Sequence, residues 1–262
     1  MLPVGGRPVV QYAWEEAVAC GVRQIAIVVS SQKEPLLKYF QSDRGLEKWL
    51  KGRGFEDLAD EIRSLGRSAK VQFIFQEKRL GLGHAVLMCR EFVGHDPFAL
   101  LNPDNIYFGE RPCLSILLEA WKEGYRPVIL LGKISKAEAA KVGVASVEPV
   151  KRKGVYLVKD LQEKPGEEKA LSHFGVWGRA ILSSEIMDYL KRTPADETGE
   201  VQLTDGLRLL AREKPLYGVL CPLKRYDAGE LTGFVRANVA FLRRLKKGKS
   251  ILAKNFYNPE AS

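Results

Sequence analysis

The sequence contains few of the residues that build disulfide frameworks and zinc sites. Its 262 residues include four cysteines and three histidines. The cysteines are scattered at positions 20, 89, 113 and 221, without a Cys-x-x-Cys pair or a neighbouring histidine. This spacing excludes a disulfide scaffold and a zinc ribbon, and it is typical of a protein in a reducing cytoplasm. We therefore predict a cytoplasmic location.

Long hydrophobic runs are also absent. Apolar segments such as 25–29 and 128–131 have only the length of a buried strand. A helix that crosses a bilayer needs about 20 apolar residues, so no membrane span is predicted. The first residues do not form a charged segment followed by an apolar one, so secretion is not expected.

The charge is unbalanced towards basic residues. Lysine and arginine total 41 against 32 acidic residues, which gives a formal net charge of +9. A nucleic-acid-binding protein would interleave basic residues with exposed aromatics or carry a known module, and none is present. A basic excess also suits an enzyme with polyanionic phosphate substrates. We predict no nucleic-acid partner, although charge alone does not decide between these classes.

Strand-like and helical segments alternate in the first half of the chain. The predicted strands lie at 25–29, 71–75, 98–101 and 128–131. The predicted helices lie at 8–20, 35–40 and 114–122, with another starting near residue 83 and a charged amphipathic stretch over 46–65. Alternation of this kind indicates βαβ units with right-handed crossovers. The expected fold is therefore α/β, with a mostly parallel sheet.

The pattern changes after residue 142. Short strands at 143–147, 155–159 and 172–177 precede helices near 184–191 and 202–212. We see no repeat, low-complexity linker or shift in composition that would mark a domain boundary. One doubly wound domain with a C-terminal substrate-binding portion is the predicted architecture.

Polar and glycine residues follow the predicted strand at 71–75. In open α/β sheets, ligands bind beyond the carboxyl ends of the strands. Gly81 can bring the backbone close to a base or a phosphate, or it can serve only as a tight turn into a helix. Gln76 can read a pyrimidine edge with its amide, or cap the strand end. His84 is expected to pack at the helix start rather than act as a base.

Carboxylates and a lysine follow other strands. Asp104 comes directly after the strand at 98–101, where it could bind Mg²⁺ or stabilise a turn. Glu163 and Lys164 place a hydroxyl acceptor beside a phosphate-binding ammonium group, or form a surface ion pair. Asp227, in Asp-Ala-Gly, could supply a second carboxylate or belong to an ordinary turn. Each of these signals is weak alone.

In combination, the motifs resemble the bacterial UTP–glucose-1-phosphate uridylyltransferases along essentially the whole chain. The motifs are Met1-Leu-Pro-Val4, Gln11-Tyr12 with Glu15-Glu16-Ala17, the insert around Leu46-Glu47, Gly81-Leu-Gly-His-Ala-Val86, Glu163-Lys-Pro165, Val176-Trp-Gly-Arg179, Val201-Gln-Leu-Thr-Asp205 and Tyr226-Asp-Ala-Gly229. The resemblance implies a Rossmann-like nucleotidyltransferase fold with a mixed, mostly parallel sheet flanked by helices. It implies one domain over 1–262, with a nucleotide-binding portion at 1–141 and a sugar-phosphate-binding portion at 142–262.

The resemblance also implies roles for residues at matching positions. Gln76 and Gly81 match the uracil contacts of the family. Asp104 matches its magnesium-binding aspartate, and Asp227 stands where related enzymes bind a metal.

The matching positions on the sugar side lie later in the chain. Gly143 matches a backbone that contacts glucose, Glu163 matches the glutamate that binds its hydroxyls, and Lys164 matches the lysine on the sugar phosphate. The cofactor implied is Mg²⁺, and Asp104 and Lys164 are the implied catalytic residues.

The implied reaction transfers a uridylyl group from UTP to glucose 1-phosphate, which gives UDP-glucose and pyrophosphate. The phosphate nucleophile is already ionised, so alignment and charge neutralisation suffice. Two alternatives stay open: a non-catalytic sugar-phosphate-binding homologue, and a related enzyme that uses dTTP or CTP. The resemblance also implies a homo-oligomer, either a dimer or a tetramer.

The start of the chain departs from the family. There the Met-Leu-Pro-Val segment is internal and follows a strand and a glycine-rich loop that holds the triphosphate. We therefore expect the chain to lack a strand and a loop, on the order of 20–35 residues. Met1 is then either an internal methionine taken for the start or the first residue of a truncated homologue.

Overall fold

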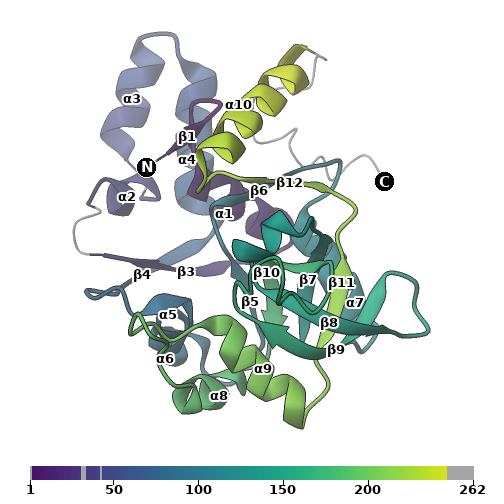
Figure 1. Cartoon of the computed structure of the whole chain (residues 1–262). Coiled ribbons are helices and arrows are strands. Elements are labelled where there is room, and N and C mark those ends of the chain that lie inside the picture. Colours follow the sequence, from purple (N-terminus) through teal and green to yellow (C-terminus); the bar gives the residue numbers. More distant parts are fainter. Residues whose placement is uncertain (1, 31–33, 42, 247–262) are drawn as a thin grey trace.

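The computed structural model describes residues 2–30, 34–41 and 43–246 (Figure 1). The helices lie at α1 (Val9–Ala19), α2 (Glu34–Tyr39), α3 (Arg44–Gly52), α4 (Glu56–Ser68), α5 (Gly81–Met88), α6 (Arg90–Val93), α7 (Cys113–Lys122), α8 (Ile186–Arg192), α9 (Leu203–Glu213) and α10 (Leu231–Lys246), with a 3₁₀ turn at Ala137–Ala140. The strands lie at β1 (Pro3–Val4), β2 (Arg7–Pro8), β3 (Gln24–Val29), β4 (Lys70–Phe75), β5 (Phe98–Leu101), β6 (Asn105–Phe108), β7 (Val128–Lys133), β8 (Val144–Pro149), β9 (Val155–Gln162), β10 (Phe174–Leu182), β11 (Tyr217–Leu220) and β12 (Lys224–Asp227). The predicted α/β class is confirmed.

The main sheet has six strands in the order β5-β10-β7-β11-β9-β8. A single bridge between Gly175 and Val144 also joins β10 to β8, so the strands from β10 to β8 form a closed ring. The centre is β7, whose residues 128–131 are fully buried. Alternate side chains of a strand point to opposite faces. Accordingly Ile129 and Leu131 pack in a core with α8 and α9, whereas Val128 and Leu130 pack in a second core with α7.

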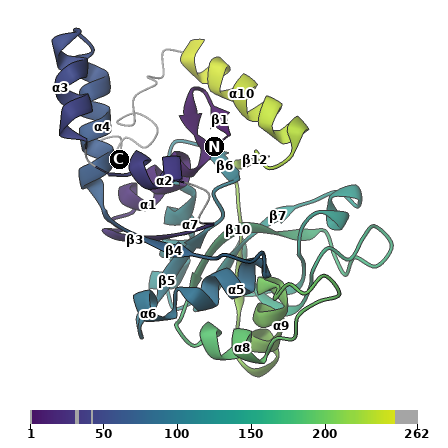
Figure 2. The same cartoon turned by 90° about the vertical axis from the view of Figure 1, so that its left-hand side faces the viewer.

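Three smaller sheets complete the structure. β3 and β4 form a parallel pair, β6 and β12 an antiparallel pair, and β1 and β2 a short antiparallel pair. The β3–β4 pair shares a core with α1, α2 and α4, which includes Trp14, Val29 and Phe40. Among the described residues, β3 pairs only with β4 and β5 only with β10, so each presents an unpaired edge. Figures 1 and 2 show α3, α4 and α10 projecting on the side away from α8 and α9.

The prediction of a mostly parallel sheet is wrong, although the sheet is mixed as expected. Among the strands described, only β3–β4 and β7–β11 pair in parallel, and the other pairings are antiparallel. Parallel neighbours need a crossover of a dozen or more residues. The loop at 150–154 that joins β8 to β9 is too short for one, so these strands form a hairpin.

The amphipathic stretch at 46–65 belongs to two helices, α3 and α4. α3 ends near Arg53, and Gly54, with φ of +80°, turns the chain into α4. Asp43 caps α3 by accepting a hydrogen bond from the Leu46 N–H at 2.9 Å.

Met1, whose place in the chain the resemblance puts in question, lies outside the described residues. Within the ranges given above, no helix combines the length and the apolar character needed to cross a bilayer.

Candidate functional site

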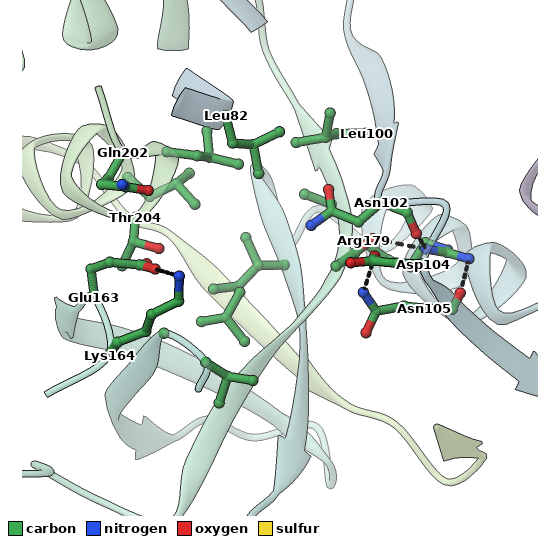
Figure 3. A pocket seen from close by; sticks show the side chains of 18 of the residues that line it. Leu82, Leu100, Asn102, Asp104, Asn105, Glu163, Lys164, Arg179, Gln202 and Thr204 are labelled. Carbon is green, nitrogen blue, oxygen red and sulfur yellow. Dashed lines mark hydrogen bonds and ion pairs between the residues drawn. The ribbon is translucent and has the colours of Figure 1, made fainter. Parts of the chain in front are cut away.

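A cavity of about 330 Å³ opens between the main sheet, α9 and the β6–β12 pair (Figure 3). It brings together most of the predicted site residues, namely Asp104, Gly143, Glu163, Lys164 and Asp227. Apolar side chains, including Leu82 and Leu100, lie between the polar groups. Residues far apart in the sequence therefore form one site with two polar sides.

The first polar side carries the two predicted metal-binding carboxylates. A Cβ placed on Gly229 would lie 3.2 Å from Asp227 Oδ1 and 3.4 Å from Asp104 Oδ2, so both carboxylates border the same small space. The Asp104 carbonyl also accepts a hydrogen bond from the Ala228 N–H at 2.8 Å, which joins the two loops. Burial raises the pKa of Asp227, the Arg225 guanidinium lowers it, and the Asp104 carboxylate raises it further, with a net increase.

This acidic side has the chemistry of a hard-cation site. Asp104 Oδ1 accepts a hydrogen bond from Asn105 Nδ2 at 2.6 Å, whereas Asn105 Oδ1 is buried and has no hydrogen-bond partner among the described residues. Mg²⁺ prefers oxygen ligands and is commonly held by one or two carboxylates together with substrate phosphates and water. Within the described part of the chain, no cluster of three or more His, Cys, Asp or Glu residues could hold a metal. The Asp104–Asp227 pair therefore fits Mg²⁺ only if oxygen atoms of a substrate and water supply the remaining ligands.

The second polar side is formed around β8 and the end of β9. Lys164 Nζ lies 3.4 Å from Glu163 Oε1, and the lysine side chain is more than half exposed. A Cβ on Gly143 would lie 3.0 Å from Thr204 Oγ1 and 3.6 Å from Glu163 Oε2. Because Gly143 has no side chain, room for a ligand remains beside the Thr204 hydroxyl and the Glu163 carboxylate, with the Lys164 ammonium group next to that carboxylate. Figure 3 shows these groups facing the acidic side across the cavity.

The predicted uracil contacts, Gln76 and Gly81, do not line this cavity. The N–H of Gln76 donates to Val29 O at 2.8 Å, which places the residue just beyond the β3–β4 pair. Gly81 begins α5 with φ of +89°, and a Cβ there would lie 2.6 Å from Val201 O. Leu82, the next residue, does line the cavity, so the two residues adjoin it at one end.

A buried ion pair supports the acidic side from behind. Arg179 donates to both oxygens of Glu16, at 3.0 and 2.9 Å, and both side chains are almost fully buried. The same guanidinium donates to Asn102 O at 2.7 Å and to Asn105 O at 2.9 Å. Burial lowers the pKa of Arg179, but the Glu16 carboxylate more than offsets this and keeps the guanidinium charged. Arg179 thereby fixes both ends of the short loop that carries Asp104.

Comparison with known proteins identifies the family. The sequence profile described as nucleotidyl transferase matches residues 1–244. The chain belongs to the nucleotidyl transferase family. This membership confirms the predicted nucleotidyltransferase fold and enzyme class.

Individual nucleotidyl transferases give closer comparisons. A Staphylococcus saprophyticus protein named UTP–glucose-1-phosphate uridylyltransferase 2 is 33% identical over 242 residues, which cover 92% of this chain and 83% of that protein. A crystal structure of UDP-glucose pyrophosphorylase with UDP-glucose has a TM-score of 0.83 at 31% identity and covers 93% of this chain and 90% of that one. A UTP-bound enzyme from Acinetobacter baumannii has a TM-score of 0.84 at 28% identity, with coverage of 98% and 88%. The resemblance stated from the motifs is confirmed.

Several residues of this nucleotidyl transferase site were not predicted from the sequence. Thr204 and Gln202 line the cavity, and both belong to the Val-Gln-Leu-Thr-Asp motif that indicated the family without suggesting a role. Arg225 donates to Asp227 Oδ2 at 2.8 Å. Its position two residues before that aspartate is the feature of the sequence that could have indicated this contact. Asn105 follows Asp104 directly, yet nothing in the sequence indicated that its amide would contact that carboxylate.

Proposed function

We propose that this protein transfers a uridylyl group from UTP to glucose 1-phosphate and requires Mg²⁺. A phosphate oxygen of the sugar phosphate forms a bond to the α-phosphorus of UTP, and the bond from that phosphorus to the β-phosphate oxygen breaks. The products are UDP-glucose and pyrophosphate. The observation that carries the proposal is one cavity with an acidic pair on one side and Glu163, Lys164 and Gly143 on the other.

The proposed sugar-phosphate subsite is the Glu163 side of the cavity. The Glu163 carboxylate accepts hydrogen bonds from glucose hydroxyls, and the backbone at Gly143 approaches the ring because no side chain intervenes. Lys164, which is more than half exposed and reaches into the cavity, neutralises the sugar phosphate. These residues orient the nucleophile. Because the phosphate is already ionised, it can attack without a general base.

The proposed metal ligands are Asp104 and Asp227. When bound there together with the nucleotide phosphates, Mg²⁺ would neutralise charge and polarise the phosphoryl group. Arg179 would keep the Asp104 loop in place, because it holds the carbonyls of Asn102 and Asn105. In this proposal residues 1–141 supply the nucleotide-binding portion, with Gln76 and Gly81 at the uracil, and residues 142–262 supply the sugar-phosphate-binding portion.

We further propose that the protein acts in the cytoplasm as a homo-oligomer. The four cysteines are scattered along the sequence without a Cys-x-x-Cys pair, which is in keeping with a reducing compartment. Large apolar side chains are exposed on α3, α4 and α10, including Trp49, Leu58 and Leu231. Exposed apolar surface of this kind is typical of an interface with another chain.

The first test is pyrophosphate release from UTP plus glucose 1-phosphate, with and without Mg²⁺. We expect wild-type release to need the ion and Asp104→Asn to reduce the rate at least about 100-fold, because a charge that stabilises the transferring phosphate is lost. Asp57→Asn, at an exposed acid of α4, is the matched control and should leave the rate unchanged.

Three other outcomes would contradict the proposal. Folded protein that binds glucose 1-phosphate but not UTP would indicate a non-catalytic sugar-phosphate-binding homologue. A higher kcat/KM with dTTP or CTP than with UTP would reassign the nucleotide. Activity that survives in Asp104→Asn would remove the acidic pair from the mechanism.

A further inference from the structure

The amide of Gln76 has both of its donor hydrogens occupied by the protein. Its Nε2 lies 3.2 Å from Gly81 O and 3.0 Å from His84 Nδ1. A carbonyl oxygen can only accept a hydrogen bond, so the side facing Gly81 must be the NH₂ group. This contact fixes the orientation of the amide without reference to any ligand.

The position of the Gly81 carbonyl is set by tight packing. The start of α5 is tied to the segment before α9, because Val201 N donates to Leu80 O and Gly83 N donates to Val201 O, each at 2.8 Å. A Cβ on Gly81 would lie 2.6 Å from Val201 O, so this backbone has little room to move. Figures 1 and 2 show α5 below the β3–β4 pair, and Gln76 is the residue that follows the last residue of β4, Phe75.

The same contact determines the state of His84. Because Gln76 Nε2 is the donor, His84 Nδ1 accepts, and this contact selects the tautomer with the ring proton on Nε2. A proton on Nδ1 would set a donor against a donor. The side-chain atom of Gln76 left for a ligand is then its amide oxygen, Oε1, which can only accept a hydrogen bond.

We propose that His84 is a positioning residue that sets nucleotide specificity: it holds Gln76 so that only its carbonyl faces the base. The inference rests on the proposed function, in which Gln76 lies at the base of the nucleotide. A carbonyl at this place accepts from the N3–H of uracil or thymine. Cytosine has an unprotonated N3, which would set an acceptor against an acceptor. The site therefore selects UTP over CTP and does not by itself distinguish uracil from thymine.

Three variants test the inference by the ratio of kcat/KM for UTP to that for CTP. His84→Phe removes the acceptor, frees the Gln76 amide to rotate, and should lower the ratio about tenfold, the effect of one hydrogen bond of about 1.4 kcal/mol. His84→Asn places a carbonyl near the position of Nδ1 and should restore most of the ratio. His95→Phe, at an exposed histidine elsewhere, is the matched control and should change nothing. His84 is only partly buried, so its variants are expected to fold.

A second readout is independent of activity. The sequence has three histidines, so long-range ¹H–¹⁵N spectra of wild type and His84→Phe assign the His84 ring directly. We expect the Nε2–H tautomer in the free protein, and a proton on Nδ1 would overturn the inference. An unchanged UTP-to-CTP ratio in His84→Phe, with wild type still preferring UTP, would overturn it as well. A wild-type protein that binds neither nucleotide would instead overturn the proposed function.

Discussion

Lys164 has a φ of +40°, the one described residue other than glycine with a positive value. A side chain in the left-handed region costs roughly 1 kcal/mol, and such strain is often found at functional positions. We expect Lys164→Gly to be more stable than Lys164→Ala by about 1 kcal/mol, or about 2–4 °C in Tm. Both variants should lose about 100-fold in kcat/KM for glucose 1-phosphate, because each removes the ammonium group.

Thermal unfolding and steady-state kinetics check this pair, with Lys169→Gly and Lys169→Ala as controls. Lys169 is exposed and has no positive φ, so its glycine variant should be no more stable than its alanine variant. Equal stability of the two Lys164 variants would show that the strain contributes nothing. A normal KM for the sugar phosphate in Lys164→Ala would place the phosphate elsewhere.

At the residue scale, the site residues that could be predicted from the sequence are those that belong to a local motif. Asp104, Glu163 and Lys164 follow strands, where ligands of α/β proteins bind, and the structure places all three in one cavity. Thr204 could not be predicted, since its place in the site depends on a contact across the fold. The proximity of Thr204 to Gly143, for instance, joins positions that are far apart in the chain.

The Glu16–Arg179 pair joins several elements. Glu16 lies in α1 and Arg179 in β10, and Glu16 Oε1 also accepts from the Leu114 N–H at the start of α7. Removing one member leaves a buried charge without its partner, which costs about 3–5 kcal/mol. We therefore expect Arg179→Met to lower the free energy of unfolding in urea by that amount.

The matched control is Arg192→Met in α8. Arg192 pairs with Glu213 at 3.0 Å, but both side chains are more than half exposed, so the change should cost at most about 1 kcal/mol. Equal effects of the two substitutions would mean that the buried pair does not hold α1 to β10. If Arg179→Met also raises the Mg²⁺ concentration needed for activity, the Asp104 loop depends on this guanidinium.

At the element scale, hydrophobic patterns predicted the long and strongly patterned elements. The run at 128–131 is apolar throughout and forms the most buried strand, β7. The short strands β6 and β12 were not predicted, because β12 has four residues, of which three are charged, and its burial is partial. Their pairing becomes apparent only when Asp227 is aligned with Asn105, an interaction between distant segments.

At the scale of the whole molecule, pairing direction was the property that local patterns could not supply. β10 lies between β5 and β7 and runs antiparallel to both, although the strand–helix–strand pattern predicted from the sequence would make β5 and β7 neighbours. A strand from late in the sequence inserts between earlier ones, and neither propensity nor periodicity encodes that insertion. The cavity depends on it, since β10 supplies Val176, Gly178 and Arg179 to its wall.

The proposed self-association predicts the behaviour of α10. Leu231, Val235, Val239 and Leu242 are 78%, 51%, 42% and 56% exposed, and their spacing of four, four and three residues places them on one face of the helix. The opposite face is already buried through Ala237 and Phe241. Removing apolar surface from water is favourable by roughly 25 cal/mol per Å². A second chain that covers this stripe would therefore form a stabilised complex.

We expect light scattering after size-exclusion chromatography to give a wild-type mass above the 29.3 kDa of one chain. Val235→Asp places a charge in the stripe and should shift the mass towards that of the monomer, because a buried unpaired carboxylate opposes association. Arg236→Asp introduces the same side chain one position away, outside the stripe, and should keep the wild-type mass. A monomeric wild type at every concentration would contradict the proposed oligomer. A comparable loss in Arg236→Asp would show that net charge, rather than the apolar face of α10, controls assembly.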